Sequence, residues 1–199
     1  MKVALVIPTY NERENIIALI PAVLRIFSEH SISGSIIVVD DSSPDGTGNV
    51  VNELSERLGN VILVSRKEKL GLGSAYRTGF SEALSLGFDG IMEMDADGQH
   101  DPLLIPKFVR KLNDGFDLII GSRYIIGGEI GNWPLERRLI SKSASLFVRF
   151  LFKSKIRDPT SGYRIFSRRS LETIHGAKLY THGYTYQVEM AVRYETRGF

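Results

Sequence analysis

The chain has 199 residues, of which 43% are hydrophobic and 24% charged, and its formal net charge is +2. This composition is typical of one globular domain with a continuous core, and it excludes a disordered chain. Cysteine is absent, which excludes disulfides and thiolate metal sites, and no uncharged run is long enough for a signal peptide or a membrane span.

Short apolar runs alternate with segments of helical spacing along most of the chain. The runs are too short and too uniformly apolar for amphipathic helices, so they predict strands buried on both faces, at residues 3–8, 35–40, 61–65, 90–94 and 117–121. Helical spacing predicts helices at residues 12–30, 47–58, 74–86 and 102–112, the last capped by Asp101. This alternation predicts an α/β fold with three layers and a mainly parallel sheet.

The pattern changes after residue 123. A glycine-rich loop leads into residues 137–157, which contain seven basic residues and no acidic one. Within this segment, Leu146, Phe147, Phe150 and Leu151 recur at helical spacing, which is typical of a basic helix at a membrane interface and also of an ordinary core helix. A loop around residues 158–164 and a helix at residues 185–197 are predicted to follow.

Polar residues follow the predicted strands. In open α/β sheets ligands bind beyond the carboxyl ends of the strands, so these residues are the candidate site. They are Thr9 to Glu12, Asp40 to Gly46, Asp95 to His100 and Ser122 to Tyr124. Carboxylates from several strand ends repel one another unless a cation joins them, and hard oxygen ligands indicate Mg²⁺ or Mn²⁺. Such a cation would in turn bind a diphosphate.

Simpler interpretations compete with this one. Asp41 or Asp45 alone is more often a helix cap or turn former than a ligand. Asp95-Ala96-Asp97-Gly98 resembles the start of a calcium loop, but Gly98 comes too early. The same motif occurs in phosphatases that form an aspartyl-phosphate, although there it follows the first strand. No dinucleotide-binding fingerprint follows the first strand and no P-loop occurs, so metal and side chains are expected to hold the phosphates.

Five motifs in order resemble the polyprenol-phosphate branch of the family 2 glycosyltransferases, and within it the dolichol-phosphate mannose synthases. They are Pro8-Thr9-Tyr10-Asn11-Glu12, Val39 to Thr47, Asp95-Ala96-Asp97-Gly98-Gln99-His100, Gly121-Ser122-Arg123-Tyr124 and Thr160-Ser161-Gly162-Tyr163-Arg164. The resemblance covers nearly the whole chain and implies a single GT-A (Rossmann-like) catalytic domain over residues 1–199. Members of the family usually continue beyond the position of Phe199, so a longer natural protein is expected.

The resemblance also implies a role for each matching residue. The donor nucleotide-sugar is expected to meet Pro8, Tyr10, Glu12, Asp40, Asp41, Asp95, Ala96 and Asp97. The metal ligands are expected to be Asp97 and Gln99, and the acceptor phosphate is expected to meet Arg123, Arg137 and Ser141. Asp95, Asp97 and Arg123 are the expected catalytic residues. Alternatives are a surface ion pair for Arg123 and the start of a membrane-facing helix for Arg137.

The implied reaction is an inverting, metal-dependent transfer of mannose from GDP-mannose to polyprenyl or dolichyl phosphate, at the cytoplasmic face of the membrane through peripheral contact. No nucleic-acid partner is expected. A lipid phosphate is already ionised, so it needs positioning rather than a general base. A sugar hydroxyl would need a base, for which Asp158 and Glu129 are candidates. Glucose or an aminosugar as the donor sugar, and a nucleotide-sugar-binding module without turnover, stay open as alternatives.

Overall fold

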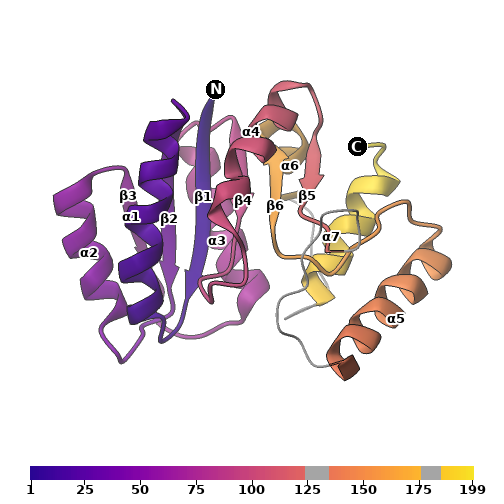
Figure 1. Ribbon diagram of the computed structural model, residues 1–199, viewed down its shortest axis with the longest axis horizontal. Coiled ribbons are helices and arrows are strands. Elements are labelled where there is room, and N and C mark those ends of the chain that lie inside the picture. The colour runs from indigo at the N-terminus through magenta and orange to yellow at the C-terminus, as the bar shows by residue number, and fades with distance from the viewer. Residues whose placement is uncertain (124–134, 176–184) are drawn as a thin grey trace.

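The structure is a computed structural model of residues 1–199. It describes residues 1–123, 135–175 and 185–199, whereas segments 124–134 and 176–184, drawn as a grey trace in Figure 1, lie outside the described residues. The side chains of residues 135–142, 144 and 175 also lie outside the description.

A six-stranded sheet in the order β3-β2-β1-β4-β6-β5 forms the centre of the molecule (Figure 1). Its strands are β1 (Lys2–Thr9), β2 (Ser33–Asp40), β3 (Val61–Ser65), β4 (Gly90–Glu93), β5 (Leu118–Ile120) and β6 (Arg164–Ser167). The strands from β3 to β4 are parallel, whereas β6 is antiparallel to both β4 and β5. The sheet is therefore mainly parallel, with one reversed strand between β4 and β5.

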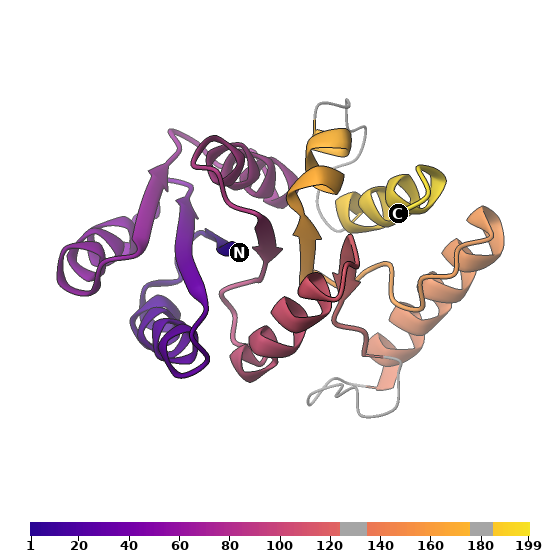
Figure 2. The ribbon, with the colours of Figure 1, turned by 90° about the horizontal axis from the view of Figure 1, so that it is seen from above.

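Helices cover both faces of this sheet, which gives three layers (Figure 2). The helices are α1 (Arg13–Glu29), α2 (Thr47–Leu58), α3 (Leu72–Ser85), the 3₁₀ turn η1 (Pro102–Leu104), α4 (Ile105–Asn113), α5 (Leu135–Phe152), α6 (Arg168–His175) and α7 (Thr185–Thr196). Successive side chains of β1 point to opposite faces. Leu5 packs with apolar residues of α1, α2 and α4, and Val6 packs with those of α3, α6 and α7.

The strand pairing brings distant segments to one edge of the sheet. Thr9 at the end of β1 pairs with Asp40 at the end of β2. Glu93, the last residue of β4, pairs with Arg164, and Ile120 at the end of β5 pairs with the same arginine. The loops that follow β1, β2, β4 and β5 therefore start from the same edge, together with the loop that precedes β6.

A glycine lets α3 approach the sheet below this edge. A Cβ atom at Gly79 would lie 2.3 Å from Cγ1 of Val6, a distance at which two carbon atoms clash unless one of the two elements shifts. The close approach brings Tyr76, one turn earlier in α3, beneath the loop after β4.

The α/β fold with a mainly parallel sheet is confirmed, and all five predicted strands are present within a residue or two of their expected ends. Three details were wrong. Strand β6 and helix α6 were not predicted, residues 102–112 divide into η1 and α4, and the edge strands β3 and β5 are only half-buried in their middle residues. Strands at the edge of a sheet lack a neighbour on one side, which leaves their side chains partly open to solvent.

Candidate active site

Asp40 joins the loops that follow β1 and β2. Its Oδ1 accepts hydrogen bonds from Oγ of Ser43 at 2.6 Å and from Oγ1 of Thr9 at 2.8 Å, and its Oδ2 accepts one from the backbone N–H of Ser43 at 3.0 Å. The residue is buried. The carboxylate that was predicted to meet the donor is therefore also a structural element that fixes this corner of the site.

Asp41 forms a two-point ion pair with Arg66, a residue that follows β3. Nε and Nη2 of Arg66 each lie 2.6 Å from a carboxylate oxygen of Asp41, and Nη1 donates to Oγ of Ser74 at 2.8 Å. Both charged side chains are nearly buried. This geometry is the strong, fork-like form of an arginine–carboxylate pair, and it links the end of β2 to α3.

The remaining residues predicted to bind the base and ribose of the donor are more exposed to solvent. Pro8 and Glu12 are partly exposed, and Tyr10 is exposed with Nζ of Lys69 3.8 Å from its ring centroid. Glu12 accepts a hydrogen bond from the side-chain amide of Asn15 at 2.6 Å. Glu12 also borders a surface cavity of about 390 Å³ that is lined by residues 11–15 and Asp45.

The loop after β4 carries two aspartates with different surroundings. Oδ1 of Asp95 accepts a hydrogen bond from the buried hydroxyl of Tyr76 at 2.7 Å, and Oδ2 lies 3.6 Å from Nε2 of His100. Asp97 is exposed, and its Oδ1 accepts a hydrogen bond from the backbone N–H of Gln99 at 3.0 Å. Asp95 is thus held against α3, while Asp97 and Gln99 face solvent. Ala96 between the two aspartates is buried in the core.

The residues after β4 have the donor chemistry of a magnesium or manganese site. Asp97 and Gln99 offer oxygen ligands on an exposed loop, and Asp95 lies at its start. Within the described part of the chain, no group of three or more histidine, aspartate and glutamate side chains converges as a complete protein cage. Mg²⁺ commonly binds through one or two protein ligands and completes its shell with water and substrate phosphates, so this donor set fits such an ion.

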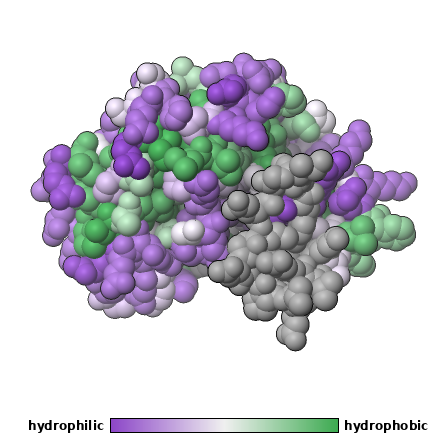
Figure 3. Space-filling model, viewed as in Figure 1, coloured by the Kyte–Doolittle hydropathy of each residue, from purple (hydrophilic) through white to green (hydrophobic). Residues whose placement is uncertain are grey.

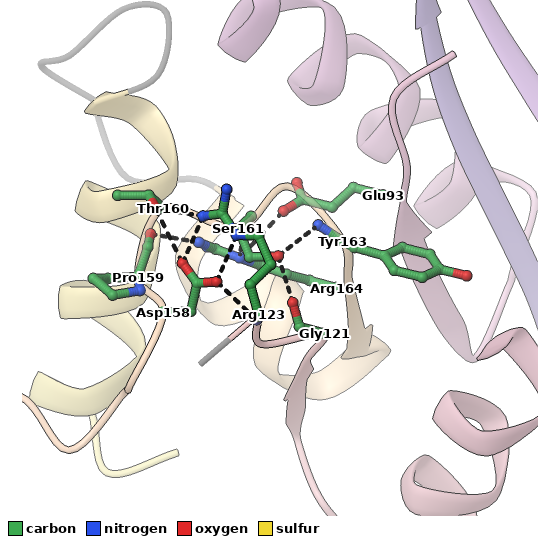
Figure 4. Close-up of polar contacts among 9 residues, drawn as sticks. All are labelled: Glu93, Gly121, Arg123, Asp158, Pro159, Thr160, Ser161, Tyr163 and Arg164. Carbon is green, nitrogen blue, oxygen red and sulfur yellow. Dashed lines mark hydrogen bonds and ion pairs between the residues drawn. The ribbon is translucent and has the colours of Figure 1, made fainter. Parts of the chain in front are cut away.

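Arg123 lies just beyond β5 and is held by Asp158 (Figure 4). Nε and Nη2 of the arginine each donate to one carboxylate oxygen at 2.8 Å, and the backbone N–H of Arg123 donates to Oδ2 at 3.1 Å. Nη2 also donates to Oγ1 of Thr160 at 2.8 Å. Asp158 is fully buried, so the pair is not the exposed surface ion pair that was considered from the sequence.

The buried carboxylate of Asp158 is not suited to accept a proton. Burial acts to raise its pKa, but the hydrogen bonds and positive charge of Arg123 outweigh burial and hold the pKa below the usual aspartate value. A general base needs a pKa near the working pH and access to the substrate. The other base considered for a hydroxyl acceptor, Glu129, lies outside the described residues, as does Tyr124.

Arg137 and Ser141 lie in α5, in the stretch whose side chains are outside the description. The described part of this helix exposes a group of large apolar side chains. They are Leu146, Phe147, Phe150, Leu151 and Phe152, with Phe150 85% exposed. Green apolar atoms accordingly protrude at one end of the molecule in Figure 3. No helix among the described residues combines the length and apolar character needed to cross a membrane.

A buried pair of ionisable side chains that the sequence did not predict lies beneath these loops. Glu93 in β4 and Arg164 in β6 are both fully buried, with Oε1 of the glutamate 3.5 Å from Nε of the arginine. Burial raises the pKa of Glu93 to about 8, although the Arg164 charge acts in the opposite direction. The sequence held a signal for Glu93 alone, as a charged residue inside an apolar run predicted to be a buried strand, because charged residues are rarely buried without a partner.

Comparison with known proteins identifies the family. Residues 4–175 match the family described as glycosyl transferase family 2. The chain is 40% identical over 195 residues to a polyprenol monophosphomannose synthase of Mycolicibacterium smegmatis, covering 98% of this chain and 72% of the relative. It is 38% identical over 193 residues to an undecaprenyl-phosphate mannosyltransferase of Micrococcus luteus, covering 97% and 77% of the two proteins. The chain is also 40% identical over 195 residues to a dolichol-phosphate mannosyltransferase of Pyrococcus furiosus. That match covers 97% of this chain and 53% of the relative.

Solved structures show the same fold at low sequence identity. A Pyrobaculum calidifontis mannosyltransferase in complex with GDP-Man and Mn²⁺ aligns with a TM-score of 0.55 at 19% identity, covering 86% of this chain and 46% of that one. Mannosyl-3-phosphoglycerate synthase from Rubrobacter xylanophilus aligns with a TM-score of 0.63 at 18% identity, covering 86% and 55%. The family match, the relatives and the three-layer GT-A-type fold together establish that this chain belongs to glycosyltransferase family 2 and is a glycosyltransferase.

Proposed function

We propose that this chain transfers mannose from GDP-mannose to the phosphate of a polyprenol or dolichol, with inversion at the sugar. The observation that supports this most is the set of relatives at about 40% identity, which are named for mannose transfer to lipid phosphates. The geometry fits the same reaction, because an acidic loop after β4 and an arginine after β5 begin at the same edge of the sheet.

The donor would lie across the loops that follow β1, β2 and β4. Tyr10 offers an exposed aromatic face, and Pro8, Glu12, Asp40 and Asp41 surround the corner where a base and ribose would bind. Asp95, Ala96 and Asp97 would meet the sugar diphosphate. The hydrogen bond from Tyr76 fixes the carboxylate of Asp95, so that this group can orient the donor without moving.

Asp97 and Gln99 would hold a Mg²⁺ or Mn²⁺ ion against the diphosphate. When bound, the cation neutralises the charge that develops on the leaving nucleoside diphosphate. The backbone N–H of Gln99 donates to one oxygen of Asp97, which orients the carboxylate and leaves its other oxygen facing solvent.

The acceptor phosphate would meet Arg123, together with Arg137 and Ser141 from α5. Asp158 and Thr160 hold the Nε and Nη2 side of the Arg123 guanidinium, so this group would meet the phosphate as a positive charge of fixed position. A lipid phosphate needs no proton removed before it attacks. Asp158 holds Arg123 and has a lowered pKa, which suits positioning rather than base catalysis. A single displacement by the phosphate oxygen on the anomeric carbon inverts that carbon.

The exposed apolar face of α5 would contact the membrane that contains the lipid acceptor, at its cytoplasmic face. Basic residues adjoin the apolar group, namely Arg149, Lys153, Lys155 and Arg157. Lysine and arginine near an anionic surface each contribute roughly 1 kcal/mol of attraction, and exposed aromatic side chains insert at the interface. Charge and apolar character thus favour a lipid surface over a second protein for this face.

The proposal is tested by incubating the protein with GDP-mannose, Mg²⁺ and a short-chain polyprenyl phosphate, and measuring radiolabelled mannose that partitions into organic solvent. We expect lipid-linked mannose, and less product with UDP-glucose or UDP-N-acetylglucosamine. Preferential use of either of those donors would assign a glucose or aminosugar transferase instead. Tight GDP-mannose binding without product from any acceptor would indicate a binding module without turnover.

A further inference from the structure

The loop at residues 158–163, which we call the bridging loop, is bound to the segment that carries Arg123. Beyond the ion pair between Asp158 and Arg123, the hydroxyl of Ser161 donates to the carbonyl of Gly121 at 2.8 Å. The backbone N–H of Gly121 donates to the carbonyl of Tyr163, also at 2.8 Å. Figure 4 shows these contacts side by side. The position of Arg123 is therefore set by the bridging loop as much as by β5.

The bridging loop also contacts the acidic loop after β4. A Cβ atom at Gly162 would lie 3.3 Å from Oδ2 of Asp95, so the backbone of the bridging loop passes close to that carboxylate. The ring of Tyr163 stacks on His100 with centroids 4.8 Å apart, and its hydroxyl donates to the carbonyl of Asp101 at 2.9 Å. One short loop thus contacts both the donor side and the acceptor side of the proposed site.

The conformation of the bridging loop is organised around the guanidinium of Arg164. Nε donates to the carbonyl of Ser161 and Nη2 donates to the carbonyl of Pro159, both at 2.7 Å. Nη1 donates to the carbonyl of Gln187 in α7 at 2.9 Å, and the carboxyl group of Glu93 lies 3.5 Å from Nε. Arg164 is 0% exposed and lies behind the loop, so it cannot itself touch a substrate.

We propose that Arg164 is a positioning residue for the acceptor: by binding three carbonyl groups behind the bridging loop, it sets the place of Arg123 relative to Asp95. This inference rests on the proposed function, in which Arg123 binds the acceptor phosphate. A planar guanidinium can satisfy three carbonyls in fixed directions, whereas a lysine ammonium at the same site reaches fewer of them with less defined geometry. Loss of that geometry should weaken binding of the acceptor more than binding of the donor.

The test compares Arg164→Lys with wild type and with Arg168→Lys as a matched control. Arg168 follows β6 at the opposite edge of the sheet, where its backbone N–H donates to the carbonyl of Asp89. We expect Arg164→Lys to raise KM for the polyprenyl phosphate about tenfold, while KM for GDP-mannose changes less than about twofold. The control should change neither constant.

Hydrogen–deuterium exchange supplies a readout that needs no turnover. In Arg164→Lys, amides of residues 118–123 and 158–163 should exchange about tenfold faster, while those of β1 and β2 keep their wild-type rates. Ser161→Ala removes the bond from the bridging loop to Gly121 without changing charge, and it keeps the carbonyl that Arg164 binds. If Arg164→Lys does not fold, this variant still tests whether the bridging loop places the Arg123 segment, because residues 118–123 should again exchange faster.

Unchanged exchange at residues 118–123 in both variants would overturn the proposal, and so would equal rises of the two KM values. If the wild-type protein transfers sugar to no lipid phosphate, the proposed function is wrong, and that result says nothing about Arg164. The exchange experiment then still decides whether Arg164 positions Arg123.

Discussion

Asp95 and Asp97 stand two residues apart, and their surroundings suit them to different tasks. Asp95 is held by the hydroxyl of Tyr76 and lies beside the bridging loop, whereas Asp97 is exposed and contacts the backbone of Gln99. A fixed carboxylate can orient a donor, and an exposed one can bind a cation together with a diphosphate. We therefore expect substitutions at the two positions to differ in their dependence on metal.

Asp97→Asn should lower kcat at least about a hundredfold while leaving the free energy of unfolding within about 0.5 kcal/mol of wild type. Asparagine retains an oxygen that can accept the N–H of Gln99, but it removes the negative charge that attracts the cation. Activity and thermal denaturation measure the two effects. Asp114→Asn, at an exposed position after α4, is the matched control and should keep full activity. Full wild-type activity in excess chelator would contradict the metal assignment.

Glu93→Gln should flatten the dependence of stability on pH. Burial raises the pKa of Glu93 from 4.5 to about 8, so its contribution to stability is complete below about pH 4.5 and is lost as pH rises toward about 8. Relative to the variant, wild type should therefore lose stability between pH 5 and pH 8. The slope approaches about 1.4 kcal/mol per pH unit for one proton.

Urea denaturation at several pH values checks this expectation. Glu172→Gln alters an exposed carboxylate that pairs with Arg168, and this control should follow the wild-type curve. A constant difference between wild type and Glu93→Gln across the whole range would show that the pKa of Glu93 is not raised.

At the scale of elements, α5 differs from the other helices. Val148 and Ser145, three residues apart, are buried, while Phe147 and Phe150 are 64% and 85% exposed. A helix that belonged to the core would bury its phenylalanines and expose its serines. The exposed apolar group on α5 is therefore expected to bind a partner. The adjacent basic residues favour an anionic lipid surface as that partner.

Binding of the wild-type protein to anionic liposomes should weaken steeply as salt is raised, because salt screens the attraction of basic residues. Phe147→Asp should weaken binding further, by about tenfold, while binding to neutral liposomes is weak for both proteins. Phe116→Asp changes an exposed phenylalanine after α4, away from α5, and serves as the control. If the wild-type protein does not bind anionic liposomes at low salt, the apolar face of α5 does not bind a lipid surface and must contact another partner.

For the whole molecule, the sheet unites segments that are far apart in the chain. The corner formed by Asp40 and Thr9, the acidic loop after β4 and the bridging loop lie at one edge. Tyr163 of the bridging loop donates to the carbonyl of Asp101, and Tyr76 of α3 holds Asp95. A ligand that spans these segments would stabilise the entire fold, because it binds the native state and not the unfolded chain.

GDP-mannose with Mg²⁺ should therefore raise the free energy of unfolding, by about 2.7 kcal/mol at a hundredfold excess over Kd. The shift in Tm should be smaller without the cation and absent with a nucleotide that does not bind. Asp97→Asn should lose most of the metal-dependent part of the shift. Equal shifts with and without Mg²⁺ would argue that the donor is held by side chains alone.

The sequence by itself determined the class of fold, the polar loops after the strands and the family. Buried parallel strands require short, uniformly apolar runs, and helices that cover them require a 3.6-residue period, so both patterns are local and can be read directly. The residues after β1, β2 and β4 were placed correctly at one edge for the same reason: parallel strands end at a common edge.

Only the tertiary structure decided what holds those loops. Strand β6 is short and reversed, and its pairing with β4 depends on partners far away in the chain. The buried pair of Glu93 and Arg164 follows from that pairing, and so does the support that the bridging loop gives to Arg123. Long-range pairing has no local period, because its free energy comes from burial and hydrogen bonds between segments that meet only after folding.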